Sequence, residues 1–577
     1  MQKLPSRRHL LPLLIPFLAA ALVFLLVQFL TAPDSENQKF EAFTQEYFAE
    51  EICSTTINLH YTLADPASAG IQDYPITLGS FDFSSSDDSS KAGQKEYLES
   101  LDPGQLTKEN QLILKLMKDD AENQEALSQF SLIQEVLSPS LGVQAQLPVL
   151  LGEYAFRTKQ DILDYLSLLK ELPGYFSQIL KFEQEKSRAG YFMSDAAADR
   201  VIDQCASFAD GKSSSMLDAS FQSRLSEFKG LSPEEKEACL SVHRKLLENY
   251  VYPAYQSLIE GLRALKGTGT NSGGLAGFPD GKDYYRFLLR SQVGTDDSPE
   301  TIRQRLLLQL QSDLQEMQTI LAQDPSLLSA GEDSSRQSPE EILETLQACI
   351  QEDFPSLEIR DYEVKYVDES LEDYLSPAFY LTPPADTNSP NSIYLNPASE
   401  MEGIELFTTL AHEGFPGHLY QTVYFASTKP ALIRYLYEPG GYTEGWATYI
   451  ESYAFSYADD NPLLGRLLWL NRSVNLCLYS LLDVGIHWDG WTRDDTAAFL
   501  EPFGIADTDT VSEIFQYITE TPANYLKYYY GYLSFLDIRQ AVKEREGDSF
   551  DLKEFHRQLL ELGPMPFYIL EEELGLA

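Results

Sequence analysis

The sequence predicts a mainly α-helical protein, with a large multi-helix body in two lobes and a small β-sheet next to a helix that carries a candidate metal site. Helical periodicity, with apolar residues three and four apart, extends from Lys95 to about Leu265. The same pattern returns at Ser399 and continues almost to the C-terminus. Between these stretches, from Leu357 onward, short alternating runs bounded by proline and asparagine replace the helical pattern. Two long helical stretches around one short β-like segment favour this architecture.

Residues 1–36 predict a cytoplasmic N-terminus followed by an uncleaved signal anchor. Three cations, Lys3, Arg7 and Arg8, precede a mostly apolar run of 21 residues, Leu10–Leu30, and a helix needs about 20 residues to cross a bilayer core. Cations before the run and acids after it place the rest of the chain outside the cytoplasm. We therefore expect a single-pass protein of the cell membrane, and the alternative is a secreted protein whose signal segment is cleaved. No cysteine follows the run closely, so a lipoprotein anchor is not indicated.

Two lobes are expected after the anchor. Residues 37–276 predict an N-terminal helical lobe, and residues 277–577 predict a C-terminal lobe with the small sheet near 357–397. The runs "LEIRDYEVKYV", "AFYLTPP" and "NSIYLNP" are the expected strands. Helix starts that combine an N-cap serine, a first-turn proline and nearby acids are found at Ser232, Ser298 and Ser338. The stretch "GTGTNSGGLAGFPDG" lacks a phosphate-loop pattern and predicts a loop over a cleft.

The composition excludes some classes of partner. With 88 acidic against 43 basic residues, the chain has a net charge of −45. Such a protein repels nucleic acid, so no nucleic-acid partner is expected. The five cysteines are scattered without a CxxC pair, which indicates neither a zinc knuckle nor a disulfide framework.

A candidate metal site lies in "AHEGFPGHLYQ", Ala411 to Gln421. Two histidines four residues apart on a helix lie about 40° apart around its axis and can hold one metal ion. His412 and His418 are six residues apart, which is about 240° on a regular helix and prevents shared binding. The intervening Gly414, Pro416 and Gly417 can interrupt the helix. The sequence therefore predicts a zinc site only if the helix breaks between the two histidines.

A third ligand is expected on the next helical segment, "GGYTEGWATYIESYA". Glu444 is the first candidate, and Glu451, seven residues later near the same helical face, is the reserve. Two histidines and one glutamate leave a coordination position open, as in catalytic zinc sites. Glu413 would be the general base that takes a proton from water and passes it to the leaving amine.

Four ordered motifs carry a family resemblance: "LAHEGFPGHLYQ", "EGWATYIE", "LLDVGIHWDGW" and "PANYLKYYYGYLSFLDIR". The sequence resembles the bacterial domain of unknown function 885 family, whose members are similar to zinc metallopeptidases of the thermolysin-like clan. The resemblance implies His412, His418 and Glu444 as metal ligands, Glu413 as the base and a metallopeptidase-like C-terminal lobe. Leu419 stands where the family often has a further histidine, so that position is not expected to bind metal.

The same resemblance draws attention to two further residues and one strand. His487, with Asp483 four residues before it to orient the imidazole, would stabilise the oxyanion or hold the substrate terminus; a structural histidine is the alternative. Tyr528 would donate to the tetrahedral oxygen, although its tyrosine-rich neighbourhood is also typical of packing. The segment Asn391 to Pro397 would be the edge strand that binds the substrate backbone.

The expected function is hydrolysis of peptide bonds by an extracytoplasmic, membrane-anchored peptidase with one catalytic zinc ion per chain. The substrate would be a peptide, and a helical cleft would favour short peptides over folded proteins. Two alternatives stay open: a zinc amidase or other hydrolase acting on cell-envelope material, and a catalytically silent surface protein that binds ligands. Specificity and oligomeric state do not follow from the sequence.

Overall fold

The computed structural model describes residues 35–576 except 82–87, 140, 211–215, 330–336, 358, 360, 368–371, 373, 374, 459 and 460. The predicted anchor run, Leu10–Leu30, lies outside the described residues. Within the described part of the chain, no helix is both long and apolar enough to span a bilayer.

The chain is mainly helical, as predicted, with one small sheet. The helices before residue 270 are α2 (Glu36–Ile52), α3 (Thr56–Thr62), α4 (Asp88–Ser100), α5 (Lys108–Ser128), α6 (Val143–Gly152), α7 (Lys159–Ala189), α8 (Asp195–Asp210), α9 (Met216–Glu227), α10 (Pro233–Leu246) and α11 (Tyr252–Leu265). Those after it are α12 (Gly281–Leu288), α13 (Pro299–Gln323), α14 (Pro339–Cys349), α15 (Gly403–Glu413), α16 (His418–Ser427), α17 (Gly440–Tyr457), α18 (Pro462–Val484), α19 (Arg493–Leu500), α20 (Thr508–Glu520), α21 (Asn524–Glu546), α22 (Leu552–Leu562) and α23 (Phe567–Glu573).

The helix starts predicted from Ser-Pro-acid sequences are confirmed. Ser232, Ser298 and Ser338 are the N-caps of α10, α13 and α14, and each side chain accepts a hydrogen bond from the third residue of its helix. At Ser232 and Ser338 the acid at that third position bonds back to the cap, which completes a capping box. Short-range capping chemistry is therefore sufficient to place these three helix ends.

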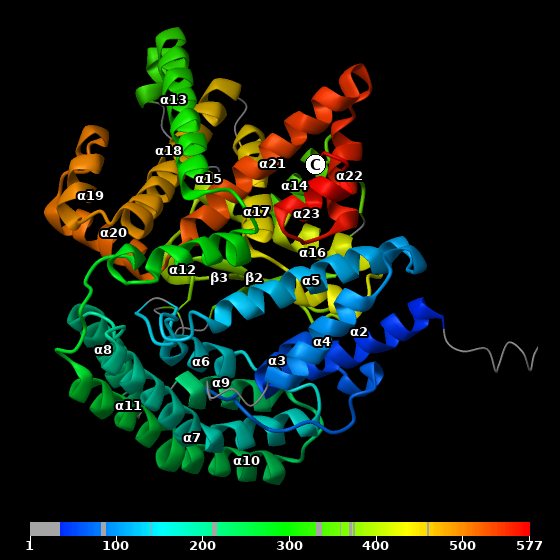
Figure 1. Cartoon of the computed structure of the whole chain (residues 1–577), viewed down its shortest axis with the longest axis vertical. Helices are drawn as coiled ribbons and strands as arrows, with labels where there is room; N and C mark the ends of the chain where they lie inside the picture. The colour runs from blue at the N-terminus through cyan, green and yellow to red at the C-terminus, as the bar shows by residue number, and fades with distance from the viewer. Residues whose placement is uncertain are drawn as a thin grey trace, which may run out of the picture.

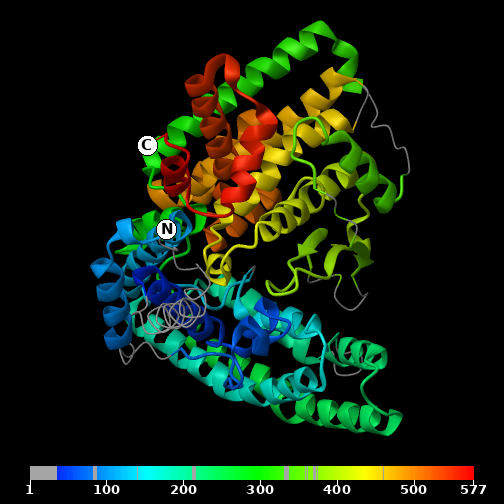
Figure 2. The same cartoon turned by 90° about the vertical axis from the view of Figure 1, so that its right-hand side faces the viewer.

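Two large hydrophobic cores, with two small satellite clusters, make up the interior of the described chain. The smaller core lies mainly among residues 137–262 and belongs to α6–α11, which form one body in Figures 1 and 2. The larger core combines residues 40–133 with residues 275–574. The first helices, α2–α5, therefore pack against the C-terminal part of the chain, and the spatial division does not coincide with a single cut at residue 276.

A three-stranded sheet lies beside α15, where the sequence predicts one. Its strands are β1 (Tyr362–Tyr366), β2 (Ala378–Leu381) and β3 (Asn391–Leu395), in the order β1-β3-β2. β3 is parallel to β1 and antiparallel to β2. The expectation that Asn391 to Pro397 forms an edge strand is therefore wrong, because both backbone edges of β3 are already paired. The edge strand on the α15 side is β2.

The close crossing of α17 and α21 fixes the walls of the candidate site. A Cβ atom on Gly445 would lie 2.6 Å from Cα of Gly531, closer than real Cβ atoms approach a backbone atom. A Cβ atom on Gly531 would collide with the carbonyl oxygen of Gly441. Glycine at these positions allows the two backbones to touch and brings the first turns of α17 against α21 around Gly531.

Candidate metal centre

The helix that carries His412 ends before His418. Helix α15 stops at Glu413, and α16 begins at His418 after a turn through Gly414 and Gly417. A Cβ atom on Gly417 would collide with the carbonyl oxygen of His412, so only glycine fits where the chain folds back. The indole of Trp446 donates to the carbonyl oxygen of Pro416 at 3.0 Å and ties the turn to α17. The predicted helix break is therefore present.

Substituting Gly417 with alanine should displace His418 and weaken metal binding. The added methyl group has no space against the backbone of His412, and overpacking of this kind costs about 1–3 kcal/mol of folding free energy. We expect a zinc dissociation constant raised at least about tenfold, because even small shifts of ligand geometry weaken metal sites. Calorimetric zinc titration measures this change. The matched control is Gly174→Ala in α7, where no atom lies within 4 Å of the added Cβ; equal zinc affinity for both variants would contradict the prediction.

The break brings the two imidazoles to a common point. The ring centroids of His412 and His418 are 4.8 Å apart. Glu444 Oε2, from the first turns of α17, lies 3.5 Å from Nε2 of His412 and 3.6 Å from Nε2 of His418. The two histidines and Glu413 also offer ligand atoms within 4.8 Å of one another. Among the described residues, this is the only group of three or more such side chains compact enough to hold a metal ion.

These distances fit a tetrahedral zinc site. Bonds of about 2.0–2.2 Å at tetrahedral angles place neighbouring ligand atoms about 3.3–3.6 Å apart. Glu444 Oε2 is buried and has no hydrogen-bond partner in the described part of the chain, which is costly for a carboxylate unless another positive group binds it. Although burial raises the pKa of Glu444, the two imidazoles lower it far below the ordinary value. The two histidines and Glu444 can therefore hold a cation.

Glu451, the reserve ligand, occupies a different position. Its Oε1 accepts a hydrogen bond from Nδ1 of His412 at 2.8 Å, and its Oε2 accepts one from Nε of Arg472, also at 2.8 Å. A carboxylate that orients a histidine from behind fixes which ring nitrogen faces the metal. Here Nε2 of His412 is left facing Glu444. Burial opposes protonation of His412, but the carboxylates of Glu444 and Glu451 outweigh it and raise its pKa to about 10. The contacts of Glu451 thus favour Glu444 as the third ligand.

Glu413 is held by the edge of the sheet. Its Oε2 accepts a hydrogen bond from the backbone N–H of Tyr380 in β2 at 2.8 Å. Tyr528, from the first turn of α21, places its ring 6.3 Å from the His412 ring at an interplanar angle of 22°. Burial, followed by the charge of Glu444, raises the pKa of Tyr528, so its hydroxyl keeps its proton at neutral pH. The structure therefore brings the predicted base and the predicted tyrosine beside the two histidines.

A cavity of about 550 Å³ opens onto this cluster. His412, Glu413 and Tyr528 line it, together with Ser376 to Ala378 at the start of β2 and Arg472 on α18. Neither Arg472 nor the backbone of Tyr380 was predicted from the sequence as part of the site. No local sequence pattern points to either of them. Arg472 lies 60 residues after His412 in the sequence. Tyr380 contributes only its backbone N–H, which every residue except proline has.

The structure does not bring His487 into this cluster; its contacts are those of the alternative, a structural histidine. Its side chain is fully buried, its Nδ1 accepts the N–H of Leu275 at 3.1 Å, and its Nε2 donates to the carbonyl oxygen of Ile518 at 2.8 Å. Asp483 does not orient it: the carboxylate accepts from the hydroxyl of Tyr285 and from the N–H of Ala523. Both ring nitrogens are used by the backbone, so none is left for a substrate.

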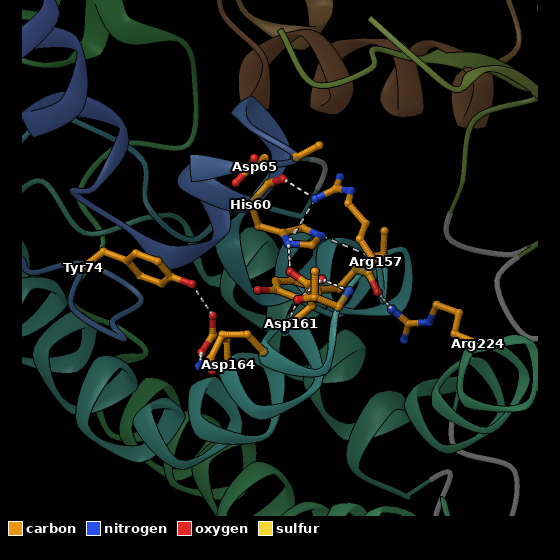
Figure 3. A network of polar contacts seen from close by, with 12 residues as sticks. His60, Asp65, Tyr74, Arg157, Asp161, Asp164 and Arg224 are labelled. Carbon is orange, nitrogen blue, oxygen red and sulfur yellow. Dashed lines mark hydrogen bonds and ion pairs between the residues drawn. The ribbon is translucent and has the colours of Figure 1, made fainter. Parts of the chain in front are cut away.

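The other described histidines lie in structural contacts. The Nε2 of His243 lies 3.2 Å from the hydroxyl of Tyr165, and its Nδ1 lies 3.5 Å from Asp218. His60 receives the N–H of Ala155 on Nε2 at 3.1 Å, and its Nδ1 lies 3.6 Å from Asp161, within the polar network of Figure 3. In the same network the hydroxyl of Tyr74 donates to Asp164. His556 uses Nε2 towards Tyr449 and Nδ1 towards a backbone carbonyl. Of the described histidines, His412 and His418 alone form a pair around a common point.

The buried neutral histidines predict loss of stability in acid. Burial lowers the pKa of His487 to about 4 and that of His556 to about 3, from an ordinary 6.5. Below pH 6.5 the unfolded chain takes up these protons while the folded chain does not, so the free energy of unfolding falls as the pH is lowered. Each of these two histidines should lower the free energy of unfolding by on the order of 2–3 kcal/mol between pH 6.5 and pH 4.

Urea unfolding of the metal-free protein measures this dependence. His487→Gln should lose less stability than the wild type between pH 6.5 and 4.5, while the comparison at pH 7.5 gives the cost of the substitution alone. Parallel loss of stability in both proteins would show that His487 does not contribute to the acid sensitivity.

Comparison with known proteins gives a family and a fold. The sequence profile described as "Bacterial protein of unknown function (DUF885)" matches residues 80–574. No curated protein sequence matches this chain significantly. A candidate lipoprotein from Colwellia psychrerythraea has a similar structure, with a TM-score of 0.81 and 21% identity over 94% of this chain and 99% of that protein.

Two more solved structures are similar to lesser degrees. A candidate lipoprotein of unknown function from Shewanella oneidensis has a TM-score of 0.62 and 16% identity, over 92% of this chain and 99% of that protein. A candidate oligoendopeptidase F from Bacillus anthracis aligns over 88% of this chain and 95% of that protein, with 10% sequence identity. Its TM-score of 0.34 does not establish a shared fold. The two lipoprotein structures show the fold alone, whereas the profile match extends over most of the sequence. The chain belongs to the bacterial domain of unknown function 885 family.

Proposed function

We propose that this protein is a zinc-dependent peptidase that hydrolyses peptide bonds with a metal-activated water. The buried Oε2 of Glu444 has no hydrogen bond and faces the Nε2 atoms of His412 and His418 at 3.5 and 3.6 Å, and this arrangement carries the proposal. The same three residues are the ligands that the family resemblance implies. One zinc ion per chain would bind there.

The ligand set leaves room for chemistry. Zinc bound by three protein ligands supplies Lewis acidity, lowering the pKa of a water molecule and polarising the carbonyl that is attacked. Glu413, on the cavity wall, takes the proton from the water and returns it to the leaving amine. Its hydrogen bond from Tyr380 holds one carboxylate oxygen and leaves the other available for this transfer. Tyr528, which keeps its proton at neutral pH, donates a hydrogen bond to the oxygen that gains charge in the transition state.

Strand β2 replaces β3 as the element that would hold an extended substrate. Backbone groups two residues apart in a strand point to the same edge. Since the N–H of Tyr380 faces Glu413, the N–H and C=O of Ala378 are expected at the same edge, and Ala378 lines the cavity. A peptide added to this edge would pass beside the metal ligands.

The anchor predicted within residues 1–36 would place this body on the outer side of the cell membrane. Support for it comes from the sequence alone, in the cations before Leu10–Leu30 and the acids after it.

Incubation of the zinc-loaded full chain with a mixed peptide library, read by mass spectrometry, tests the function. We expect cleavage that stops when a chelator removes zinc and returns when zinc is restored. If the zinc-loaded protein cleaves no peptide but releases amide-linked groups from cell-envelope material, the amidase alternative replaces the peptidase.

A further inference from the structure

A lysine beside the metal centre has no anionic partner in the described part of the chain. Lys527 lies next to Tyr528 in the first turns of α21 and is partly buried. Its side chain makes no hydrogen bond and no ion pair within 4.0 Å to any described residue. Other lysines without an ion pair to a described residue, such as Lys170, Lys245 and Lys543, are exposed to solvent, whereas Lys527 is partly buried. Elsewhere, Lys115, Lys186 and Lys266 all bind carboxylates.

Helix packing fixes the course of the Lys527 side chain. Contact between Gly445 and Gly531 sets the crossing of α17 and α21, and Lys527 lies one turn before Gly531. Its Cδ lies 2.7 Å from the position that a Cβ atom would take on Gly440, the first residue of α17. The side chain therefore passes over Gly440, and any larger residue there would displace it. Glu444 is one turn further along α17, on the same face as Gly440.

The two nearest carboxylates are already used. Asp483 accepts hydrogen bonds from Tyr285 and from the N–H of Ala523. Glu444 directs Oε2 at the two histidines. Burial lowers the pKa of Lys527 despite the charges of these two acids. A positive group that is partly desolvated and lacks an ion-pair partner is stabilised when a ligand brings a negative charge.

We propose that Lys527 binds a carboxylate of the substrate near the peptide bond that is cleaved. This inference rests on the proposed peptidase function and names the substrate class: peptides with a negative charge close to the bond. The carboxylate is either the C-terminus of the peptide or an aspartate or glutamate side chain, since both offer the same acceptor atoms to an ammonium group. Lys527 directly precedes Tyr528, which lines the cavity, and the charge of Lys527 acts on the carboxylate of Glu444, so the anchor is placed beside the proposed metal ligand.

Equilibrium binding tests the anchor without relying on turnover. The zinc-loaded full chain with Glu413→Gln is titrated calorimetrically with four matched peptides: one with a free C-terminal acid and an internal aspartate, its C-terminal amide, its asparagine analogue and the doubly neutral form. Loss of a charge-assisted hydrogen bond should weaken binding about tenfold or more. Weakening by amidation identifies the C-terminus as the anchor group, and weakening by asparagine identifies the side chain.

Adding Lys527→Gln should remove the preference for the charged peptide and bring its affinity to that of the doubly neutral form. Lys527→Arg should keep most of the preference, because it keeps the charge. Lys543→Gln, an exposed position near the far end of the same helix, is the matched control and should behave as the parent.

The outcomes separate this inference from the proposed function. If the wild type binds zinc and cleaves peptides, but Lys527→Gln leaves all four affinities unchanged, the anchor is overturned and the peptidase stands. No measurable binding of any charged peptide to zinc-loaded protein also overturns the anchor. Failure of the chain to bind zinc overturns the proposed function itself, and it is detected before any peptide is added.

Discussion

Replacing Glu413 with glutamine is expected to reduce peptide hydrolysis by about a thousandfold while leaving zinc bound. General acid–base catalysis contributes about 10²–10⁴ to rates of this kind, and an amide cannot take a proton from water. The substitution changes few atoms, and the N–H of Tyr380 can still donate to an amide oxygen at the position of Glu413 Oε2. The zinc content of the purified variant and its kcat on a cleaved peptide measure the two parts of this prediction.

The matched control is Glu402→Gln, at the start of the same helix. Glu402 is exposed and its side chain makes no capping hydrogen bond, so the same chemical change there should leave kcat within about twofold of the wild type. Full activity of Glu413→Gln would remove Glu413 from the proposed mechanism. Loss of zinc from this variant would instead show that Glu413 is a ligand. This outcome would fit the structure, because Glu413 offers a carboxylate oxygen within 4.8 Å of the ligand atoms of His412 and His418.

Replacing His418 with alanine is expected to abolish stoichiometric zinc binding and, with it, all hydrolysis. The substitution removes one of the three proposed ligands and leaves Glu444 Oε2 with one imidazole neighbour instead of two. The loss of affinity should exceed the 10–100-fold typical of outer residues that only orient a ligand. Zinc analysis by mass spectrometry after dialysis at neutral pH measures it.

Ser427→Ala, at the other end of α16, is the control for His418→Ala. Its hydroxyl donates only to the backbone carbonyl of Tyr424, so its removal should leave zinc binding unchanged. Because His418 is partly exposed, the alanine variant should fold, and its circular dichroism and urea midpoint should stay close to those of the wild type. A His418→Ala protein that keeps one zinc per chain would contradict the assignment of this ligand.

Local sequence signals were sufficient to predict the helices, the three short strands and the break in the metal helix. The break followed from Gly414, Pro416 and Gly417 because their backbone preferences are properties of the residues themselves. The position of Glu444 also followed, since it lies near the start of α17, the next α-helix after α16. Short-range chemistry therefore predicted the two histidines, the break between them and the glutamate beside them.

Long-range packing could not be predicted in the same way. Helical periodicity shows that a face is buried but not which partner covers it, so the association of α2–α5 with the C-terminal core was missed. The pairing of the strands could not be predicted either, because the order of the strands along the sequence does not show that β3 lies between the other two. His487 was expected near the site because of the family resemblance, with Asp483 to orient it, whereas the structure gives both side chains other partners. The place of Arg472 in the site and the role proposed for Lys527 follow only from their neighbours in the folded structure, which the sequence does not state.

Anomalous diffraction at the zinc absorption edge, from crystals of the zinc-loaded protein, tests the central claim most directly. We predict one strong anomalous peak per chain, within about 2.0–2.2 Å of Nε2 of His412, Nε2 of His418 and a carboxylate oxygen of Glu444, with Glu451 still bonded to Nδ1 of His412. A peak elsewhere, or no peak at the two histidines in crystals grown with excess zinc, would contradict the proposed metal centre and the peptidase function built on it.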